Sequence, residues 1–334
     1  MKPVLIILLD AFNPEYLTKD LFLSSLYQAK LKSIIGYNCV LGSVVTGLSP
    51  AEHGRWNLFT HQPSNLGIEK LFKVYDKFPS VYKMLLKHGR QFSVKQEKPH
   101  PNKQAYKVKT IFDELRQKNK RFLYSNHPWW INNDKQLWLP TPYSDELVFK
   151  LVKNKLKSYE FVFIHLYELD RLGHEFNQKK IKSFIKVLDE KVAKLVKAWS
   201  GEVLIFSDHG MYPVKNIYDV RQWLKDELYF LESTMIRLWQ PKKKTLEKLN
   251  QLEYGRFLTA KEKKYYVPSE KYGTEFWCLK QGGLICPNFW QKKPVKAMHG
   301  YVDEPPTLLL GSSKFNKKSY LMTDLHKVIL KLIK

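Results

Sequence analysis

The 334-residue sequence predicts an α/β fold with a mostly parallel central sheet and helices on both faces. Short apolar runs alternate along the chain with longer amphipathic stretches, which is the pattern of parallel strands joined by crossover helices. Apolar residues make up 44% of the chain and aromatic residues 14%, enough for a packed core, and this excludes intrinsic disorder as the main state. The length fits one large α/β domain with an insertion, or about two domains.

Four apolar runs are predicted to be strands of this sheet: residues 4–9, 121–124, 161–166 and 203–206. The first run is apolar throughout, as expected of a strand that is buried on both faces. Residues 110–118 and 181–199 carry apolar side chains at helical spacing and are predicted to be helices of the covering layers. Residues 324–334 are predicted to form a final amphipathic helix on the core, with a membrane-surface helix as the alternative.

The amino-acid composition and the pattern of predicted elements change after residue 225. Residues 242–272 are strongly charged, contain two predicted helices and lack a long β-type run. We therefore expect residues 226–289 to form a small inserted cap. The catalytic core would then consist of residues 1–225 and 290–334.

The chain is strongly basic, with 56 Lys and Arg against 32 Asp and Glu and a net charge of +24. A basic balance is compatible with a nucleic acid, an anionic membrane surface or an anionic substrate as partner, and equally with lysines spread over solvated faces. No apolar run approaches the roughly 18 residues of a transmembrane helix. The first apolar run is short, ends at Asp10 and has no small-residue cleavage site after it, so we expect a cytoplasmic protein. Three cysteines are too few for a disulfide framework.

Acidic residues and histidines recur where the predicted strands end. In an open parallel sheet these strand ends share one edge, at which ligands bind. Carboxylate and imidazole together suit Zn²⁺, with Mn²⁺ or Fe²⁺ as alternatives. Each residue alone has an ordinary explanation, such as a helix cap or a turn, but their conjunction predicts a metal centre. The candidate ligands are Asp10, Asp170, His174, Asp208, His209 and His299.

Six segments occur in an order that resembles the alkaline phosphatase superfamily, in particular its nucleotide pyrophosphatase/phosphodiesterase (type I phosphodiesterase) branch. They span residues 10–301, which is most of the chain. The resemblance implies an alkaline-phosphatase-like fold with an inserted cap. The segments are the strand ending at Asp10, Val45-Thr46-Gly47-Leu48-Ser49-Pro50-Ala51-Glu52-His53-Gly54, Glu168-Leu169-Asp170-Arg171-Leu172-Gly173-His174, Ser207-Asp208-His209-Gly210-Met211, Ser233-Thr234-Met235-Ile236-Arg237-Leu238-Trp239 and Met298-His299-Gly300-Tyr301.

The resemblance also implies a division of the ligands between two divalent metal ions. One ion would be held by Asp170, His174 and His299, and the other by Asp10, Asp208 and His209. Such pairs of ions clamp the attacking and leaving oxygens of an in-line displacement. The implied activity is hydrolysis of phosphodiester or pyrophosphate bonds in a small anionic substrate that is nucleotide-like or nucleotide-sugar-like. Nucleic acid as a partner and the oligomeric state are left open.

The sequence departs from the family at the nucleophile. The resemblance places the family's Thr or Ser at Tyr37, and Asn38 follows. Cys39 is the first nucleophilic residue, and a slightly shorter loop would bring it into the site. A thiolate beside two cations is deprotonated and can ligate zinc. Ser43 is a weaker candidate, because its position suggests the helix after the nucleophile.

Several alternatives remain at this point. Cys39 is either the nucleophile or a small buried residue beside a site in which a water activated by the metals attacks. A sulfatase would need Pro or Ala two residues after the cysteine and Arg four residues after it, whereas Val40-Leu41-Gly42-Ser43 follows. A phosphomonoesterase, or a metal- and anion-binding relative without turnover, would use the same ligands.

Three further residues are candidates for substrate binding. Asn57 is expected to help hold a phosphoryl oxygen, although its distance from the His-Gly step differs by one from the family's, and a turn residue is the alternative. Thr234 and Arg237 are expected at the entrance of the cap, where they could orient an anionic substrate. For Arg237 an ordinary amphipathic position is an equal alternative.

Overall fold

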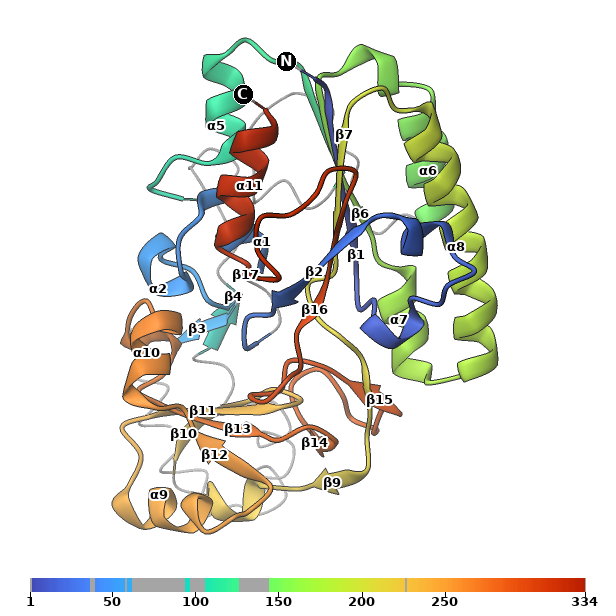
Figure 1. Ribbon diagram of the computed structural model, residues 1–334. Coiled ribbons are helices and arrows are strands. Elements are labelled where there is room, and N and C mark those ends of the chain that lie inside the picture. The colour runs from blue at the N-terminus through green and yellow to red at the C-terminus, as the bar shows by residue number, and fades with distance from the viewer. Residues whose placement is uncertain are drawn as a thin grey trace.

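The computed structural model describes residues 2–36, 40–57, 59–61, 94–96, 106–125, 144–225 and 227–333, with the backbone alone for 94–96 (Figure 1). A seven-stranded sheet runs through the larger part of the molecule. Its strands, from one edge to the other, are β17 (Ser319–Leu321), β2 (Tyr27–Lys32), β16 (Thr307–Gly311), β7 (Glu202–Phe206), β1 (Val4–Leu9), β6 (Phe161–Leu166) and β5 (Phe122–Ser125).

The centre of this sheet is parallel. β1 pairs in parallel with β6 and β7, and β6 pairs in parallel with β5. β16 runs antiparallel to both β7 and β2, and β17 returns parallel to β2. The predicted α/β class with a mostly parallel sheet is confirmed, and the four predicted strands are β1, β5, β6 and β7.

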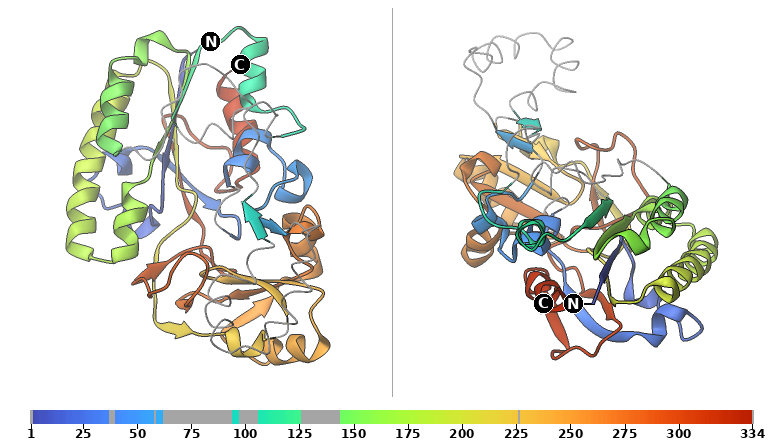
Figure 2. Two further views of the ribbon diagram at one scale, coloured as in Figure 1. Left: turned by 180° about the vertical axis from the view of Figure 1, so that it is seen from behind. Right: turned by 90° about the horizontal axis from the view of Figure 1, so that it is seen from above.

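Helices cover both faces of the sheet (Figures 1 and 2). Side chains of β1 alternate between two apolar clusters: Val4, Ile6 and Leu8 pack into one, and Leu5, Ile7 and Leu9 into the other. All six are at most 2% exposed, which explains why this strand is apolar throughout. The first cluster lies under α1 (Val40–Thr46), α5 (Ile111–Gln117) and α11 (Asp324–Leu332), and the second under α6 (Asp145–Lys153) and α8 (Gln178–Ala198).

A second, antiparallel sheet lies beyond the carboxyl ends of the central strands (Figure 1). Its strand order is β10 (Leu228–Leu231), β11 (Met235–Trp239), β13 (Glu275–Leu279) and β12 (Gly255–Phe257). The two helices expected in the charged stretch are present as α9 (Lys243–Asn250) and α10 (Ala260–Tyr266). All of these elements come from the segment interpreted above as a cap, but the sheet was not expected, because its strands are short.

The remaining elements are short. Within the described residues no helix combines the length and the hydropathy needed to span a membrane. The short elements are α2 (Pro50–His53), α7 (Glu168–Glu175), the strand pairs β3 (Phe59–His61) with β4 (Val94–Gln96), β9 (Asn216–Tyr218) with β14 (Gly283–Ile285) and β8 (Tyr212–Pro213) with β15 (Ala297–Met298), and the 3-10 helices Pro14–Tyr16, Phe22–Ser25, Leu156–Ser158, Arg221–Trp223 and Glu270–Tyr272.

Candidate metal centre and active site

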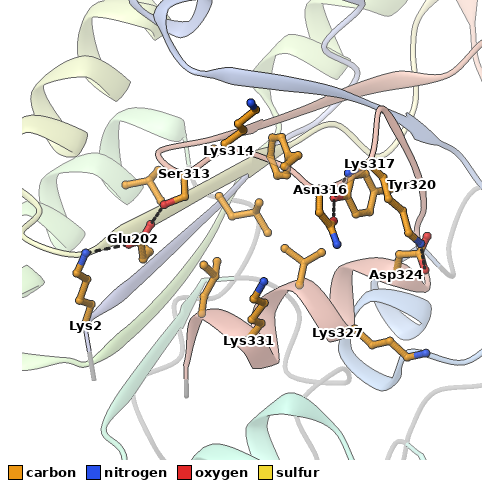
Figure 3. A pocket seen from close by; sticks show the side chains of 16 residues that line it. Lys2, Glu202, Ser313, Lys314, Asn316, Lys317, Tyr320, Asp324, Lys327 and Lys331 are labelled. Carbon is orange, nitrogen blue, oxygen red and sulfur yellow. Dashed lines mark hydrogen bonds and ion pairs between the residues drawn. The ribbon is translucent and has the colours of Figure 1, made fainter.

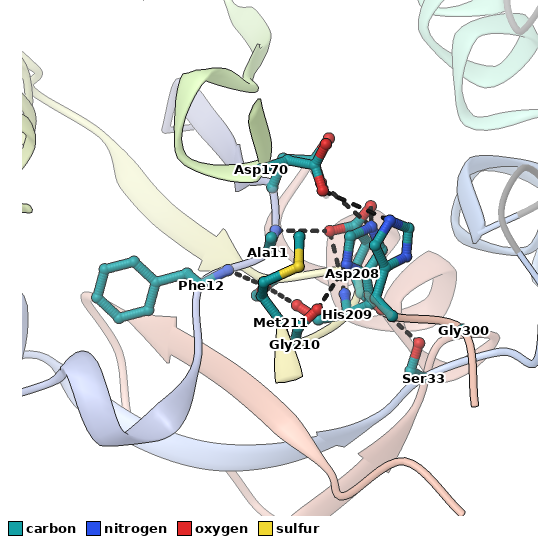
Figure 4. A network of polar contacts seen from close by, with 12 residues as sticks. Ala11, Phe12, Ser33, Asp170, Asp208, His209, Gly210, Met211 and Gly300 are labelled. Atoms are coloured by element: carbon teal, nitrogen blue, oxygen red, sulfur yellow. Dashed lines mark hydrogen bonds and ion pairs between the residues drawn. The ribbon is translucent and has the colours of Figure 1, made fainter. Parts of the chain in front are cut away.

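Three carboxylates meet at the carboxyl edge of the parallel strands. Asp10 directly follows β1, Asp208 lies two residues after β7, and Asp170 lies in α7, just beyond β6. Because β7, β1 and β6 are neighbours in the sheet, these strand ends bring the three side chains into one cluster. Figure 4 shows Asp170 on the side of this cluster opposite to the loop that carries Asp208 and His209.

His209 faces both Asp10 and Asp208. Its Nε2 lies 3.2 Å from Asp10 Oδ1 and 3.5 Å from Asp208 Oδ2. Its Nδ1 lies 2.9 Å from the Gly210 carbonyl oxygen, which can only accept a hydrogen bond. Nδ1 is therefore protonated, and Nε2 is the nitrogen directed at the carboxylates, as in metal-binding histidines. One ligand atom from each of the three residues fits within 4.8 Å.

Asp170 is the centre of a second group. His174 Nε2 lies 3.5 Å from its Oδ2, and His299 Nε2 lies 3.5 Å from its Oδ1. His174 Nδ1 donates to the Ala297 carbonyl oxygen at 2.9 Å, which again leaves Nε2 available as a ligand. The rings of His209 and His299 stack with centroids 3.6 Å apart and planes 2° from parallel, so the two groups adjoin. The structure thus brings all six candidate ligands together. Asp10, Asp208 and His209 form one close set and Asp170, His209 and His299 form the other, with His174 beside Asp170. The expected division of the ligands between two ions remains a prediction.

The electrostatics of the site favour bound cations. Burial and the neighbouring charge of Asp10 raise the pKa of Asp208 to about 7. Burial also acts to raise the pKa of Asp10, but hydrogen bonds with His165 and His209 lower it below its usual range. Two buried carboxylates this close are costly without a compensating positive charge. Since carboxylate and neutral imidazole are the ligands that Zn²⁺ and related divalent ions take, the residues present fit a metal pair.

The loop after β7 is held in place by the loop after β1. Asn13 Nδ2 donates to the Met211 carbonyl oxygen and Asn13 Oδ1 accepts from the Met211 amide, both at 2.8 Å. Ser33 donates to the carbonyl oxygen of Asp208 from the end of β2. A Cβ at Gly210 would lie 2.5 Å from Asn13 Oδ1, so a side chain at this position would displace the loop that carries His209.

Glu304 joins the two histidine loops and was missed in the sequence. Its Oε1 accepts from the Gly210 amide at 2.6 Å, and its Oε2 accepts from the Gly300 amide at 2.8 Å. One carboxylate therefore ties the residue after His209 to the residue after His299. No local sequence pattern singles out Glu304, because only the folded chain brings residue 304 next to residue 210.

His165 is the second residue that sequence reasoning missed. It lies in β6, inside an apolar run, and its Nε2 is 2.7 Å from Asp10 Oδ2. Because Asp10 Oδ1 faces His209, the carboxylate is held from both sides. The available signal was a single polar residue in an otherwise apolar strand, on the face opposite to Ile164 and Leu166.

Two candidates for substrate binding lie in a buried network between core and cap. Asn57 Nδ2 donates to both carboxylate oxygens of Glu232, at 2.9 and 3.1 Å. Arg237 Nε lies 2.8 Å from Glu232 Oε1, and its Nη1 donates to the carbonyl oxygens of Phe59 and Tyr272. Arg237 has no exposed surface, so the expectation that it orients a substrate is wrong: burial requires that its charge be paired.

Thr234 is also buried, and its hydroxyl donates to the Gly300 carbonyl oxygen at 3.1 Å. This bond ties the cap to the loop that carries His299. Thr234 therefore contacts the metal-binding loop instead of lining an entrance.

Cys39 lies outside the described residues. The chain on either side of it is described: Ser33, near the end of β2, contacts Asp208, and α1 begins at Val40. Ser43, the weaker candidate, is fully buried in α1, with its Oγ 3.2 Å from His53 Nε2. Ser43 is therefore part of the core.

The model of the type I phosphodiesterase/nucleotide pyrophosphatase family matches residues 68–297. No curated protein sequence matches the chain significantly. Among solved structures, an inactive variant of murine ectonucleotide pyrophosphatase/phosphodiesterase 5 in complex with AMP is similar with a TM-score of 0.70 and 16% identity, over 100% of this chain and 95% of that one. The human protein of the same name has a TM-score of 0.70 and 16% identity, over 99% and 95%.

Phosphonoacetate hydrolase from Sinorhizobium meliloti 1021, in complex with phosphonoformate, is similar with a TM-score of 0.73 and 13% identity, over 100% of this chain and 96% of that one. At these identities the structures show a common fold, whereas the family match covers more than half of the chain. The chain therefore belongs to the type I phosphodiesterase/nucleotide pyrophosphatase family of hydrolases, within the alkaline phosphatase superfamily.

Proposed function

We propose that this hydrolase cleaves phosphodiester or pyrophosphate bonds in a small nucleotide-like or nucleotide-sugar-like substrate, using two divalent metal ions. The observation that carries the proposal is the pair of adjoining carboxylate and imidazole groups at the carboxyl edge of the sheet. AMP bound to the murine relative supports a nucleotide-like substrate. Zinc is the proposed metal, because its preferred ligands match this set of donors.

We assign the binding of the two metal ions to the two groups of residues. Asp10, Asp208 and His209 would hold one ion, and Asp170, His174 and His299 the other. When bound, the two ions supply charge neutralisation at the phosphoryl oxygens and lower the pKa of the nucleophile. The side chains of Asp170 and His174 are each 25% exposed, so a substrate reaches the site from their side.

We propose Cys39 as the nucleophile. Ser33 supports this assignment, since its hydrogen bond to Asp208 fixes the described chain that leads toward residue 39 at the site. The thiolate would attack phosphorus and displace the leaving oxygen, which takes up a proton, and water would then cleave the P–S bond. Cys39→Ala should abolish turnover with metal binding largely retained, and Cys39→Ser should keep part of the turnover. Near-normal turnover of Cys39→Ala would instead assign the attack to water.

Hydrolysis of bis(p-nitrophenyl) phosphate by protein reconstituted with Zn²⁺ or Mn²⁺ tests the proposal. Turnover should disappear with a chelator and in Asp208→Asn, and should persist in Asp20→Asn, which changes an exposed aspartate. Metal analysis should find two ions per chain. Protein that binds no metal and leaves the diester intact would refute the proposal.

The phosphonoacetate hydrolase fold is the reason to test a second substrate class in parallel. Faster release of phosphate from p-nitrophenyl phosphate or phosphonoacetate than cleavage of the diester would assign the site to monoesters or phosphonates. Metal binding without turnover on any of these substrates would favour a binding protein. The cytoplasmic location remains a prediction, which fractionation of the source cells would check.

A further inference from the structure

The helix α7 carries two of the six candidate metal ligands, Asp170 in its first turn and His174 in its last. It begins directly after β6, since only Tyr167 separates the end of the strand at Leu166 from the first helical residue, Glu168. The positions of both ligand side chains therefore depend on how firmly each end of this eight-residue helix is held.

The carboxyl half of α7 is fixed by its neighbours in the fold. His174 Nδ1 donates to the Ala297 carbonyl oxygen at 2.9 Å. A Cβ at Gly173 would lie 2.8 Å from Met211 Cγ, so the helix packs closely against this methionine side chain. These contacts hold His174, but they lie about one turn away from Asp170.

The amino end of α7 is held by a side chain from another helix. The first amides of a helix have no partner within it, and the side chain of Tyr167 makes no capping hydrogen bond to them. Asp145, the first residue of α6, supplies the acceptor. Its Oδ1 accepts from the Tyr167 amide at 2.9 Å, and both of its oxygens lie 3.4 Å from the Glu168 amide nitrogen. A carboxylate at this position also faces the positive end of the helix dipole.

The start of α6 does not account for the burial of Asp145. Ser144 already caps α6, because its Oγ accepts from the Leu147 amide at 3.3 Å. Asp145 is only 3% exposed, and a carboxylate is costly to bury unless it is hydrogen-bonded. Its bonds to the start of α7 provide that compensation, so they explain why an aspartate is tolerated at this buried position.

We propose that Asp145 is a positioning residue for the metal centre. Through the amides of Tyr167 and Glu168 it sets the position of Asp170, and with it the affinity for the ion that Asp170, His174 and His299 would hold. This inference rests on the two-metal function proposed above. The other ion depends less on Asp145, because its ligands follow β1 and β7 and not β6.

Asp145→Leu tests the proposal, because leucine fills a similar volume and accepts no hydrogen bond. Titration of metal-free protein with Zn²⁺ against a chelating dye should find two ions in the wild type, and one of them should bind about 10–100-fold more weakly in Asp145→Leu. Asp145→Asn should restore most of this affinity, since its Oδ1 still accepts from the Tyr167 amide. Burial raises the pKa of Asp145 to about 7, so the neutral amide resembles a state that the carboxyl group already occupies at neutral pH.

Hydrogen–deuterium exchange of metal-free protein gives a second readout, which requires neither metal nor turnover. Peptides that cover residues 167–175 should take up deuterium faster in Asp145→Leu than in Asp145→Asn or the wild type. Peptides that cover β1 and β7 should exchange as in the wild type, because the amides bonded to Asp145 belong to the start of α7.

Asp189→Leu is the matched control, because Asp189 holds the start of another helix in the same way. It is 6% exposed and accepts from the amides of Phe22 and Leu23 at 2.8 and 2.9 Å. These amides begin a 3-10 helix that contains no candidate ligand. Asp189→Leu should therefore lower the midpoint of thermal unfolding about as much as Asp145→Leu does, and should leave the affinity for Zn²⁺ unchanged.

Glu202→Gln controls for loss of charge alone. Glu202 begins β7, at the edge of the sheet opposite to Asp208, and borders a pocket there, where it accepts from the Ser313 hydroxyl at 2.6 Å (Figure 3). Removal of its charge should leave the binding of both ions unchanged.

Equal Zn²⁺ affinities in folded Asp145→Leu and Asp189→Leu would overturn the proposal, as would equal affinities in Asp145→Leu and Asp145→Asn. If Asp145→Leu does not fold, Asp145→Ser takes its place, because serine fits the site and is too short to keep the bond to the Tyr167 amide. Wild-type protein that binds no Zn²⁺ would refute the proposed function and this inference with it. Two ions in the wild type, bound as tightly by the Asp145 variants, would refute only the role of Asp145.

Discussion

Replacement of Glu304 by glutamine tests whether a residue outside the metal ligands sets the geometry of the metal centre. Glu304 accepts one hydrogen bond on each oxygen, from the Gly210 amide at 2.6 Å and the Gly300 amide at 2.8 Å. Glutamine keeps one acceptor and turns an NH₂ group toward the second amide. One of the two loops then loses its tie, and that loop follows either His209 or His299.

The expected loss of stability follows from the type of hydrogen bond that Glu304→Gln removes. A hydrogen bond to a charged group contributes about 1.5–3 kcal/mol, so the free energy of unfolding should fall by about 2 kcal/mol. The histidine on the loop that loses its hydrogen bond should be held less firmly. Metal binding should therefore also weaken, by a factor of about 10–100, as for other residues that orient metal ligands. A purely structural role would lower stability and leave the metal affinity of the folded protein unchanged.

Two measurements separate these outcomes. Zn²⁺ affinity is measured by competition with a chelating dye on metal-free protein, and stability by urea unfolding of the same samples. Glu190→Gln is the control, because Glu190 is exposed on α8 and the substitution removes the same charge. If Glu304→Gln binds both ions as tightly as Glu190→Gln does, Glu304 does not position the metal ligands and the reasoning is refuted.

Two other predictions concern histidines. His165→Phe removes the hydrogen bond to Asp10 Oδ2 and should weaken Zn²⁺ binding about 10–100-fold, whereas His165→Gln should restore part of it; equal affinities in both variants would contradict this role. Burial lowers the pKa of His53 to about 4, so between pH 6.5 and 4 the unfolded chain binds a proton that the folded chain does not. Stability should therefore fall as the pH falls through this window, by about 3 kcal/mol, and urea unfolding of His53→Gln should show a correspondingly smaller loss.

The parts of the fold that the sequence predicted are those with a strong local signal. β1 and β6 are apolar runs buried on both faces, and α8 has a long helical periodicity. β2 was missed because only alternate residues near its end are buried, and lysines occupy the exposed positions. Its place in the sheet depends on pairing with β16, which is about 280 residues later in the chain.

In the candidate site too, residues with a local sequence signal could be predicted, whereas residues placed by distant contacts could not. Its candidate ligands could be predicted because Asp10, Asp208 and His209 lie within three residues of strand ends, and strand ends converge in a parallel sheet. Arg237 was misjudged for the opposite reason. It is a single charged residue in an apolar run, but the β10–β11 hairpin brings it next to Glu232, and the resulting ion pair is buried.

The arrangement of these contacts makes the metal centre depend on the cap. His299 and Gly300 follow the cap in the chain, and the Gly300 carbonyl oxygen accepts from Thr234, which lies between β10 and β11 of the second sheet. The Gly300 amide donates to Glu304, which also binds the loop of His209. A shift of the cap hairpin therefore acts first on His299 and then, through Glu304 and the stacked rings, on His209. Because His209 adjoins both ligand groups, the cap hairpin is mechanically connected to both proposed metal positions.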